Sequence, residues 1–255
     1  TLCKKTYPSR SIETGLKEGI MIKIIFLALL LQQVRPDFIL KKLRENTKIE
    51  SIKFEATMEI KKGKKRLLKE FHGYGKGNNF LIVFTNPEDR DVKYLKLERD
   101  LYIYLPDIDD VVRISGDMLK QSLMGSDLSY EDLMEDDPFS YYSGKIIKDT
   151  VLEGHGVYIL ELVDTTGKAQ YYRVKLFVDK TKYVPWKEEL FTKSGRKIKE
   201  IKAFTISRFG ERYYITDFII QDLRMRNSST RITYKKLEFD IKIPESFFSK
   251  ETLYK

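Results

Sequence analysis

Five carboxylates follow a Gly-Ser-Asp turn in the stretch LMGSDLSYEDLMEDD, residues 123–137, where they could carry out acid–base or metal chemistry. Paired carboxylates hydrolyse glycosides, and clustered carboxylates bind divalent cations. The stretch lacks a D-x-D-x-[DN]-G calcium loop, and the two histidines, His72 and His155, are far apart in the sequence. We therefore expect no catalytic residue, no metal and no cofactor. A hydrolase is the alternative, and it would require two carboxylates to converge in one cleft. The five are Glu131, Asp132, Glu135, Asp136 and Asp137.

A structural role explains several of these acids. The sequence SYED, residues 129–132, has the form of a capping box, in which Ser129 and Asp132 would bond to free amides at a helix start. Acids in a first helical turn are also stabilised by the helix dipole, which would account for Asp127 and Glu131. The chain has no G-x-S-x-G elbow, P-loop or dinucleotide fingerprint, and GYGKG at 73–77 is predicted to be a hairpin turn.

The elements that would position these residues are mostly strands. IKFEATMEI, residues 52–60, alternates apolar and polar side chains, which is typical of a half-buried antiparallel strand. Similar runs recur between turn sequences such as KKGK, NPED and TTGK, so about a dozen strands in one large antiparallel sheet are expected. VYILELV, residues 157–163, is apolar on both faces and needs cover on both sides.

Two segments have helical patterns instead. RPDFILKKLREN, residues 35–46, predicts a helix with Phe38, Ile39 and Leu43 on one side and Asn46 as its stop. GDMLKQSLM, residues 116–124, repeats apolar residues at helical spacing. These are Met118, Leu119, Leu123 and Met124.

The N-terminal residues are predicted to be outside the working protein. MIKIIFLALLLQQ, residues 21–33, has the short apolar run of a secretory signal, although a buried strand or helix is the alternative. We interpret residues 1–20 as a non-native upstream extension, residues 21–32 as a signal peptide, and residues 33–255 as a single domain. The sole cysteine, Cys3, then lies outside that domain.

The net charge of +9 does not by itself indicate nucleic-acid binding, because Lys and Arg alternate with acids through most of the chain. The exception is the basic run from Lys61 to Arg66, which we interpret as a solvated hairpin tip. Contact with a phosphate or lipid headgroup is the alternative. Abundant Lys and Glu beside few Asn and Gln is a balance seen in thermophile proteins.

Several motifs together resemble the outer-membrane lipoprotein-sorting family, the LolA-like proteins. They are the Phe84-x-x-Pro87 turn, the YLP strand end at 104–106, and MGSD at 124–127 followed by YEDL at 130–133. YVPWKEELFTKSGRKIKEI at 183–201 and IPESFFSKETL at 243–253 are similar to the family's C-terminal half. The likeness extends from about Asp37 to Leu253.

The resemblance implies a mainly β fold, a single curved antiparallel sheet that forms an incomplete, half-open β-barrel covered by short α-helices. It also implies a non-catalytic periplasmic carrier of lipoprotein acyl chains or other lipids in outer-membrane lipoprotein sorting. Its partners would be an inner-membrane transporter and an outer-membrane acceptor, with no nucleic acid and no membrane-spanning segment. The alternative is a non-catalytic sensor or docking subunit of an envelope complex or lipid exporter.

Two strand faces are predicted to line the apolar cavity, and the MGSD region is predicted to act as a lid. Gly125 would permit a tight backbone, and Ser126 or Asp127 would cap the next turn of the chain. The cavity candidates are Phe54, Ala56, Met58, Ile60, Val174, Leu176 and Val178. The lid and signature candidates are Met118, Leu119, Leu123, Met124, Gly125, Ser126 and Asp127.

Overall fold

The computed structural model describes residues 34–135, 137 and 139–255, and Pro36–Lys255 form one compact unit. The predicted upstream extension and signal peptide, residues 1–20 and 21–32, lie outside the described residues. The α-helix is α2, Pro36–Thr47. The strands are β1 Ser51–Lys62, β2 Lys65–Lys76, β3 Asn79–Phe84, β4 Lys93–Leu97, β5 Asp100–Leu105, β6 Asp110–Ile114, β7 Tyr142–Leu152, β8 His155–Asp164, β9 Arg173–Asp179, β10 Pro185–Phe191, β11 Lys197–Phe209, β12 Arg212–Asp222 and β13 Ser228–Phe239.

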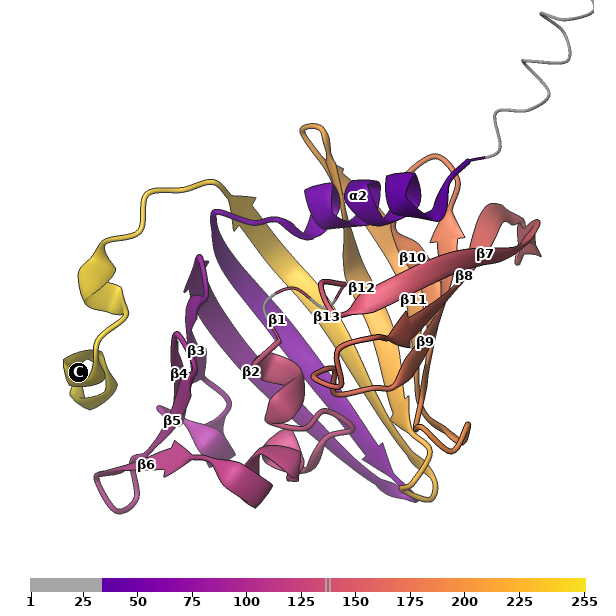
Figure 1. Ribbon diagram of the computed structural model, residues 1–255. Coiled ribbons are helices and arrows are strands. Elements are labelled where there is room, and N and C mark those ends of the chain that lie inside the picture. The colour runs from indigo at the N-terminus through magenta and orange to yellow at the C-terminus, as the bar shows by residue number, and fades with distance from the viewer. Residues whose placement is uncertain (1–33, 136, 138) are drawn as a thin grey trace, which may run out of the picture. The chain divides into compact units, whose positions relative to one another are not determined.

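The thirteen strands of the described chain form one antiparallel sheet that curls without closing (Figure 1). Their order is β6-β5-β4-β3-β2-β1-β13-β12-β11-β10-β9-β8-β7, so β6 and β7 are the two edges. Nearly every neighbour in the sheet is also a neighbour in sequence, and the long-range exception is β1 against β13. The predicted incomplete β-barrel is confirmed.

Alternation in the sequence becomes a two-faced sheet because strand side chains point to opposite faces in turn. On β1, Ala56, Met58 and Ile60 are buried and lie on the inner, concave face. Met58 is paired with Ile232 of β13, and cross-strand partners share a face. The prediction that GYGKG forms a hairpin turn is only partly right, since Gly73 to Lys76 belong to β2.

The glycine at position 73 permits a close approach that explains its place inside a strand. Gly73 is directly opposite Phe54 on β1, and a Cβ at residue 73 would lie 2.3 Å from the Phe54 ring. Because residue 73 has no side chain, the Phe54 ring can lie over it. The same ring packs edge-on against Phe71 and Tyr234, at centroid distances of 6.1 and 5.6 Å. An aromatic side chain thus covers the gap that the glycine leaves.

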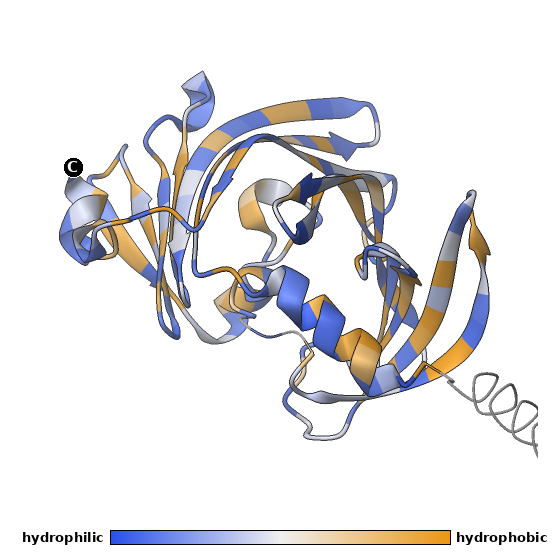
Figure 2. Ribbon diagram, turned by 90° about the horizontal axis from the view of Figure 1, so that it is seen from above, coloured by the Kyte–Doolittle hydropathy of each residue, from blue (hydrophilic) through white to orange (hydrophobic). Residues whose placement is uncertain are grey.

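Helix α2 begins and ends one residue later than predicted, and it contacts β7 and β12 (Figures 1 and 2). Its buried residues are Ile39, Leu40 and Leu43, whereas Phe38 is 43% exposed, so the predicted apolar side was wrong at that position. Gly144 of β7 allows the approach, because a Cβ there would lie 3.3 Å from Leu40 Cδ1. In Figure 2, α2 crosses the mouth of the curled sheet.

The segment from Gly116 to Leu133 contains short 3-10 turns, and α2 is the single α-helix among the described residues. The helical spacing of Met118, Leu119, Leu123 and Met124 therefore predicted the wrong element. Met124 and Gly125 have φ of 52° and 77°, and two successive left-handed residues end a helix. The predicted cover of several short α-helices is corrected to one α-helix and a set of 3-10 turns, which are η2 Gly116–Lys120, η3 Leu123–Gly125 and η4 Glu131–Leu133.

Apolar residues are buried on both faces of the sheet. On the concave face of β1 to β6, Phe84, Tyr94 and Leu101 form a cluster with Leu123 of η3. On the opposite, convex face, Leu253 from the C-terminal turn η6, Lys250–Tyr254, is fully buried against Leu81, Leu95 and Tyr102. The expectation that two-faced apolar strands need cover on both sides holds here.

Candidate functional site

A cavity of about 350 Å³ lies on the concave face of β7 to β13, next to α2. We call this part of the molecule the open half, and we call the concave face of β1 to β6 with residues 116–134 the filled half. Most of the lining is aliphatic or aromatic. The lining residues are Leu43, Asn46, Thr47, Leu128, Asp132, Glu135, Phe139, Tyr142, Leu162, Tyr171, Val174, Tyr183, Val184, Pro185, Glu188, Leu190, Lys199, Ile201, Tyr213, Tyr214, Ile215, Phe218, Ile220 and Tyr234.

Strand register explains why these side chains meet. Val174 of β9 is paired with Leu162 of β8 and with Leu190 of β10, and Leu190 is paired with Lys199 of β11. These four residues form a row across four strands, and all of them line the cavity. Cross-strand partners share a face, so a row found at one strand extends through the sheet.

Asn46 fastens the end of α2 over the cavity. Its side-chain amide donates to the backbone carbonyl oxygens of Lys182 and Tyr183, at 2.9 and 3.0 Å. Its Oδ1 accepts a hydrogen bond from the backbone amide of Tyr213, at 2.9 Å. The residue predicted as a helix stop therefore also joins α2 to β12 and to the turn before β10.

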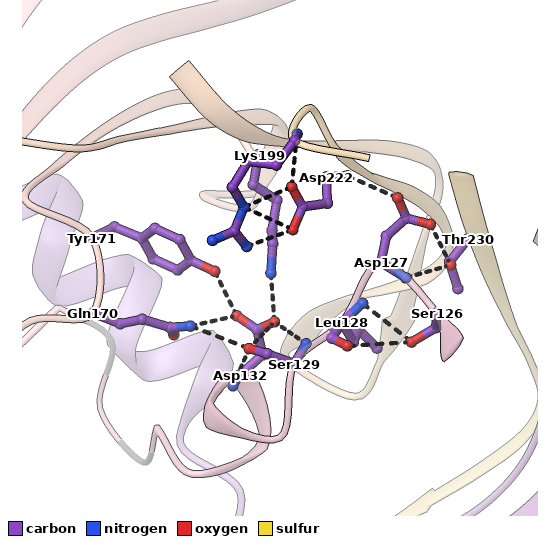
Figure 3. Close-up of polar contacts among 11 residues, drawn as sticks. Ser126, Asp127, Leu128, Ser129, Asp132, Gln170, Tyr171, Lys199, Asp222 and Thr230 are labelled. Atoms are coloured by element: carbon purple, nitrogen blue, oxygen red, sulfur yellow. Dashed lines mark hydrogen bonds and ion pairs between the residues drawn. The ribbon is translucent and has the colours of Figure 1, made fainter. Parts of the chain in front are cut away.

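The buried carboxylate of Asp132 is the centre of a polar network on the cavity wall (Figure 3). The Lys199 ammonium is 2.5 Å from Asp132 Oδ2, and the Lys199 side chain is 2% exposed. Tyr171 and Gln170 donate to Oδ1 at 2.7 and 3.1 Å. The backbone amide of Ser129 donates to Oδ2 at 2.7 Å, and Ser129 Oγ accepts from the Asp132 amide at 3.3 Å, which confirms the capping box.

Electrostatics keep this carboxylate ionised. Burial would raise the pKa of Asp132, but the Lys199 charge and the hydrogen bonds from Lys199, Tyr171 and Ser129 outweigh burial and hold the pKa below its usual value. Burial, together with the Asp132 charge, raises the pKa of the Tyr171 phenol. The network is therefore a satisfied ion pair and not a free acid or base.

A second network fixes the MGSD turn. The buried carboxylate of Asp127 accepts hydrogen bonds from Ser228 and Thr230 of β13, at 2.9 and 2.7 Å, and from the backbone amide of Asp222 at 2.9 Å (Figure 3). The expected capping role of Asp127 is thus replaced by a tie to β12 and β13. Ser126 Oγ does accept from a following amide, that of Leu128, at 3.1 Å.

Glu188 is the charged cavity residue that has no such network. No hydrogen bond or ion pair joins its carboxyl group to another described residue. Burial, with a smaller contribution from the charge of Glu135, raises the pKa of Glu188 to about 7. Its cross-strand partners are Leu176 on β9 and Ile201 on β11, so its neighbours in the sheet are aliphatic.

The structure brings some predicted cavity residues to the open half and others elsewhere. Val174 lines the cavity, and fully buried Leu176 is paired with Glu188. Val178 is also fully buried, two pairs farther along β9. Met58 and Ile60 pack in the filled half, and Ala56 and Phe54 lie next to Tyr234, which is paired with Ala56 and lines the cavity. As ligand-binding residues, all seven remain proposals.

The predicted lid residues lie in the filled half. Leu123 is buried there, Leu119 and Met124 pack against the same cluster, and Met118 is 36% exposed. The cavity wall described here includes Leu128 and Asp132 from the same stretch and none of the seven predicted lid residues. Gly125 has a positive φ of 77°, in line with the tight backbone expected there.

Sequence reasoning missed Glu188 and the tyrosines that line the cavity. Glu188 lies between Trp186 and Leu190 in PWKEELF, so strict alternation would have placed one acid among apolar residues on a single face. The tyrosines come from strands and turns between β7 and β13, far apart in the chain, and the curl of this part of the sheet brings them to one cavity. They are Tyr142, Tyr171, Tyr183, Tyr213, Tyr214 and Tyr234.

Two further classes of feature bear on function. Within residues 34–255, as far as the structure describes them, no group of three or more His, Cys, Asp or Glu side chains could hold a metal ion. No helix of the described chain has the length and apolar character needed to cross a bilayer. The site is an apolar, aromatic cavity whose wall carries the Asp132–Lys199 ion pair and the unpaired carboxyl group of Glu188.

Comparisons with known proteins agree with the resemblance. A family model described as "Uncharacterized protein" matches residues 76–255, which is more than half of the chain. A search of curated protein sequences found no match.

Solved structures show the fold. A DUF1329 family protein from Desulfovibrio piger is 27% identical, with a TM-score of 0.78 over 84% of this chain and 96% of that one. A putative outer membrane lipoprotein-sorting protein domain from Vibrio parahaemolyticus is 21% identical, with a TM-score of 0.74 over 85% and 98%. A LolA superfamily protein from Nitrosomonas europaea is 21% identical, with a TM-score of 0.70 over 86% and 100%.

Proposed function

Since the chain belongs to the family matched over residues 76–255 and has the LolA-like fold, we propose that it is a carrier of lipid or lipoprotein acyl chains. The observation that carries this proposal is the apolar cavity of about 350 Å³ next to α2. An alkyl chain contributes about 0.8 kcal/mol for each methylene buried, so an apolar cavity binds it without specific polar contacts.

The proposed setting is the bacterial periplasm, in outer-membrane lipoprotein sorting. Two of the solved structures most similar in fold are described as a lipoprotein-sorting domain and a LolA superfamily protein, and this supports the setting. An inner-membrane transporter would load the ligand and an outer-membrane acceptor would receive it. The predicted signal peptide, residues 21–32, would direct export.

The volume of the cavity limits how large the proposed ligand can be. Ligand pockets usually have volumes of about 300–1,000 Å³, so this cavity is at the small end. Helix α2 forms part of its wall through Leu43, Asn46 and Thr47. We propose that the described cavity holds one alkyl chain, and that more or longer chains would require α2 to move away from β12.

We propose no catalysis. Asp132, Glu135 and Glu188 do line one cavity, which is the arrangement that a hydrolase would require. However, Asp132 is ion-paired with Lys199 and accepts hydrogen bonds from four further side-chain or backbone donors, so it is not available as an acid or base. The remaining wall is mainly apolar, which suits a ligand held by burial of its chain.

The filled half favours a second candidate, a non-catalytic sensor or docking subunit of an envelope complex. The chain's own residues Leu123, Met124 and Leu119 occupy the concave face there. A subunit of this kind would use the fold as a docking surface and would carry no lipid.

Native mass spectrometry with lipid extraction separates the two candidates. Residues 33–255 are purified from a bacterial periplasm without detergent, and bound masses are compared between the wild type and Ile201→Trp. A bound lipid, fatty acid or acylated peptide that is recovered intact, and that is lost from Ile201→Trp, is expected because the indole fills the cavity.

The matched control is Ile147→Trp, which places the same side chain on a residue that is 48% exposed on β7. This variant should retain the ligand. A wild-type protein that stays free of ligand after addition of lipids and acylated peptides would contradict the carrier and favour the docking subunit. Release of a cleaved product would contradict the absence of catalysis.

A further inference from the structure

Glu188 occupies an unusual position for an acid. It lies in a row of cross-strand partners that runs through Leu160, Leu176, Glu188, Ile201 and Ile220, and its four companions are aliphatic. Leu160, Leu176 and Ile220 are at most 1% exposed. A carboxylate among such neighbours loses its hydration and recovers little of that free energy, unless a cation or a donor meets it.

The neighbouring residue on β10 shows what the fold does with an acid on the other face. Glu189 is on the opposite side of the same strand, where the ammonium of Lys187 lies 2.9 Å away and that of Lys197 lies 3.5 Å away. Burial would raise the pKa of Glu189, but these lysines outweigh burial and lower it. Glu188 has no such partner in the described chain, and its carboxyl group faces the cavity.

The cavity wall has more acidic side chains than basic ones. The lining contains three carboxyl groups, Asp132, Glu135 and Glu188, and one cation, Lys199. Lys199 is already paired with Asp132 at 2.5 Å. The other titratable lining groups are tyrosines from β7, β12 and β13 and from the turns before β9 and β10, and a tyrosine carries no positive charge. An anionic headgroup would therefore find no unpaired cation in this lining.

We propose that Glu188 is the counter-ion for a protonated amine on the ligand, so that the cavity selects amphiphiles in which a cationic nitrogen adjoins an alkyl chain. The proposal rests on the carrier function and names the class of ligand. The aliphatic row and the tyrosines bind the chain, and the ammonium donates to the Glu188 carboxylate, which is otherwise unpaired. Such a charge-assisted hydrogen bond is strong where water is excluded.

The pH dependence follows from the same geometry. Burial raises the pKa of Glu188 to about 7, so the carboxyl group is mostly ionised at pH 8 and mostly protonated at pH 5. Asp132 has a lowered pKa and stays paired with Lys199 at both values. Preference for an amine should therefore be present at pH 8 and weaken toward pH 5.

Titration calorimetry with three C12 probes tests the proposal on residues 33–255. Dodecylammonium should bind the wild type roughly ten- to a hundredfold more tightly than dodecanol at pH 8, the ratio expected for one hydrogen bond between charged groups. Laurate should bind more weakly than dodecanol. In Glu188→Gln, the ratio of dodecylammonium affinity to dodecanol affinity should fall to about twofold or less, whatever the change in either affinity alone.

The matched control is Glu189→Gln, which makes the same charge change on the opposite face of β10 and should retain the preference. Equal binding of dodecylammonium and dodecanol by the wild type would overturn the inference and leave the carrier intact. Tighter binding of laurate would also overturn it and would indicate that protonated Glu188 acts as a donor. Loss of the preference in Glu135→Gln but not in Glu188→Gln would assign the counter-ion to Glu135. If no probe binds the wild type, the carrier function fails first.

Discussion

The filled half and the open half share one sheet and one concave face, yet they treat that face differently. In the filled half, Leu123 and Met124 pack on Met58 and Tyr94, and the Tyr94 hydroxyl lies 3.1 Å from the Met124 sulfur. In the open half, α2 stands next to a cavity of about 350 Å³. The apolar alternation of the strands is similar in both, so the covering segment decides which half has room for a ligand.

The acidic residues of the two halves also differ in their hydrogen-bond partners. Asp127 and Asp132, which fasten the covering segment, have their hydrogen-bonding capacity met by serines, threonine, tyrosine, lysine or backbone amides. Glu188 in the open half has no described partner. Glu188 is half-buried and faces an apolar cavity. A polar group in such a place without a partner costs free energy, so the presence of Glu188 is better explained by a ligand than by stability.

The largest expected effect is at the ion pair on the border of the two halves. Lys199→Met would leave the Asp132 carboxylate buried without its counter-charge and should lower the free energy of unfolding by about 3–5 kcal/mol. Urea denaturation at pH 7 measures this loss. Lys197→Met, on the other face of β11, is the control and should change stability by about 1 kcal/mol or less.

The pH profile adds a second measure of that pair. The pKa of Asp132 is lowered in the folded protein, so its contribution is present above the unfolded pKa of about 4 and is lost as pH falls through the folded pKa. The difference between wild type and Lys199→Met should therefore shrink in acid. A difference that stays constant down to pH 2 would show that the ion pair does not cause it.

Two matched leucines compare the halves directly. Leu101 in the filled half and Leu162 on the cavity wall are both fully buried. Leu101→Ala should cost about 3–5 kcal/mol, because it opens a new void in close-packed surroundings. Leu162→Ala should cost about 2 kcal/mol, since its side chain already faces empty space and loses fewer contacts.

Ligand affinity should also differ between Leu162→Ala and Leu101→Ala. Leu162→Ala should change the affinity for a C12 alcohol, and Leu101→Ala should leave it unchanged. Equal costs in urea denaturation and equal effects on binding would mean that the two halves are packed alike, and the contrast would be lost.

The next largest expected effect is the pH dependence of stability that Glu188 causes. The pKa of Glu188 is raised in the folded protein, so the folded state binds the proton more tightly, and stability falls as pH rises from the unfolded pKa of about 4.5 to about 7. The full fall is about 3 kcal/mol. Glu188→Gln should remove this slope in thermal or urea denaturation between pH 5 and pH 8.

Glu189→Gln provides the opposite case on the same strand. The pKa of Glu189 is lowered, so its contribution is present above about 4.5 and is lost in acid below that value. Its substitution should leave the slope between pH 5 and pH 8 in place. A wild-type profile that is flat over this range would contradict the unpaired, desolvated state of Glu188.

The smallest expected effect on stability is at the end of α2. Asn46→Ala removes three hydrogen bonds to Lys182, Tyr183 and Tyr213 and should cost about 1–2 kcal/mol. Because α2 borders the cavity, ligand dissociation should become faster, as stopped-flow displacement would show. Lys42→Ala on the same helix is the control, and an unchanged rate in Asn46→Ala would mean that α2 does not control exit.

The sequence by itself determined the strands, the helix and the capping box. Alternation in IKFEATMEI, the start of α2 at Pro36 with Asn46 one residue before its end, and the Ser129–Asp132 pair are local patterns. Local backbone and hydrogen-bond preferences are enough to produce them. The motifs near Phe84, the MGSD turn and the C-terminal ESFF turn also indicated the half-open barrel correctly, although GDMLKQSLM gave 3-10 turns because Met124 and Gly125 are left-handed.

Only the tertiary structure decided where the cavity lies and which side chains line it. Alternation gives each strand two faces and does not say which one is concave or which one a covering segment occupies. Asp127 received a tie to β13 because Thr230 lies beside it, about a hundred residues away. Glu188 meets Leu176 and Ile201 only through strand register. Such long-range neighbours set burial and charge, and these determine what a binding site can hold.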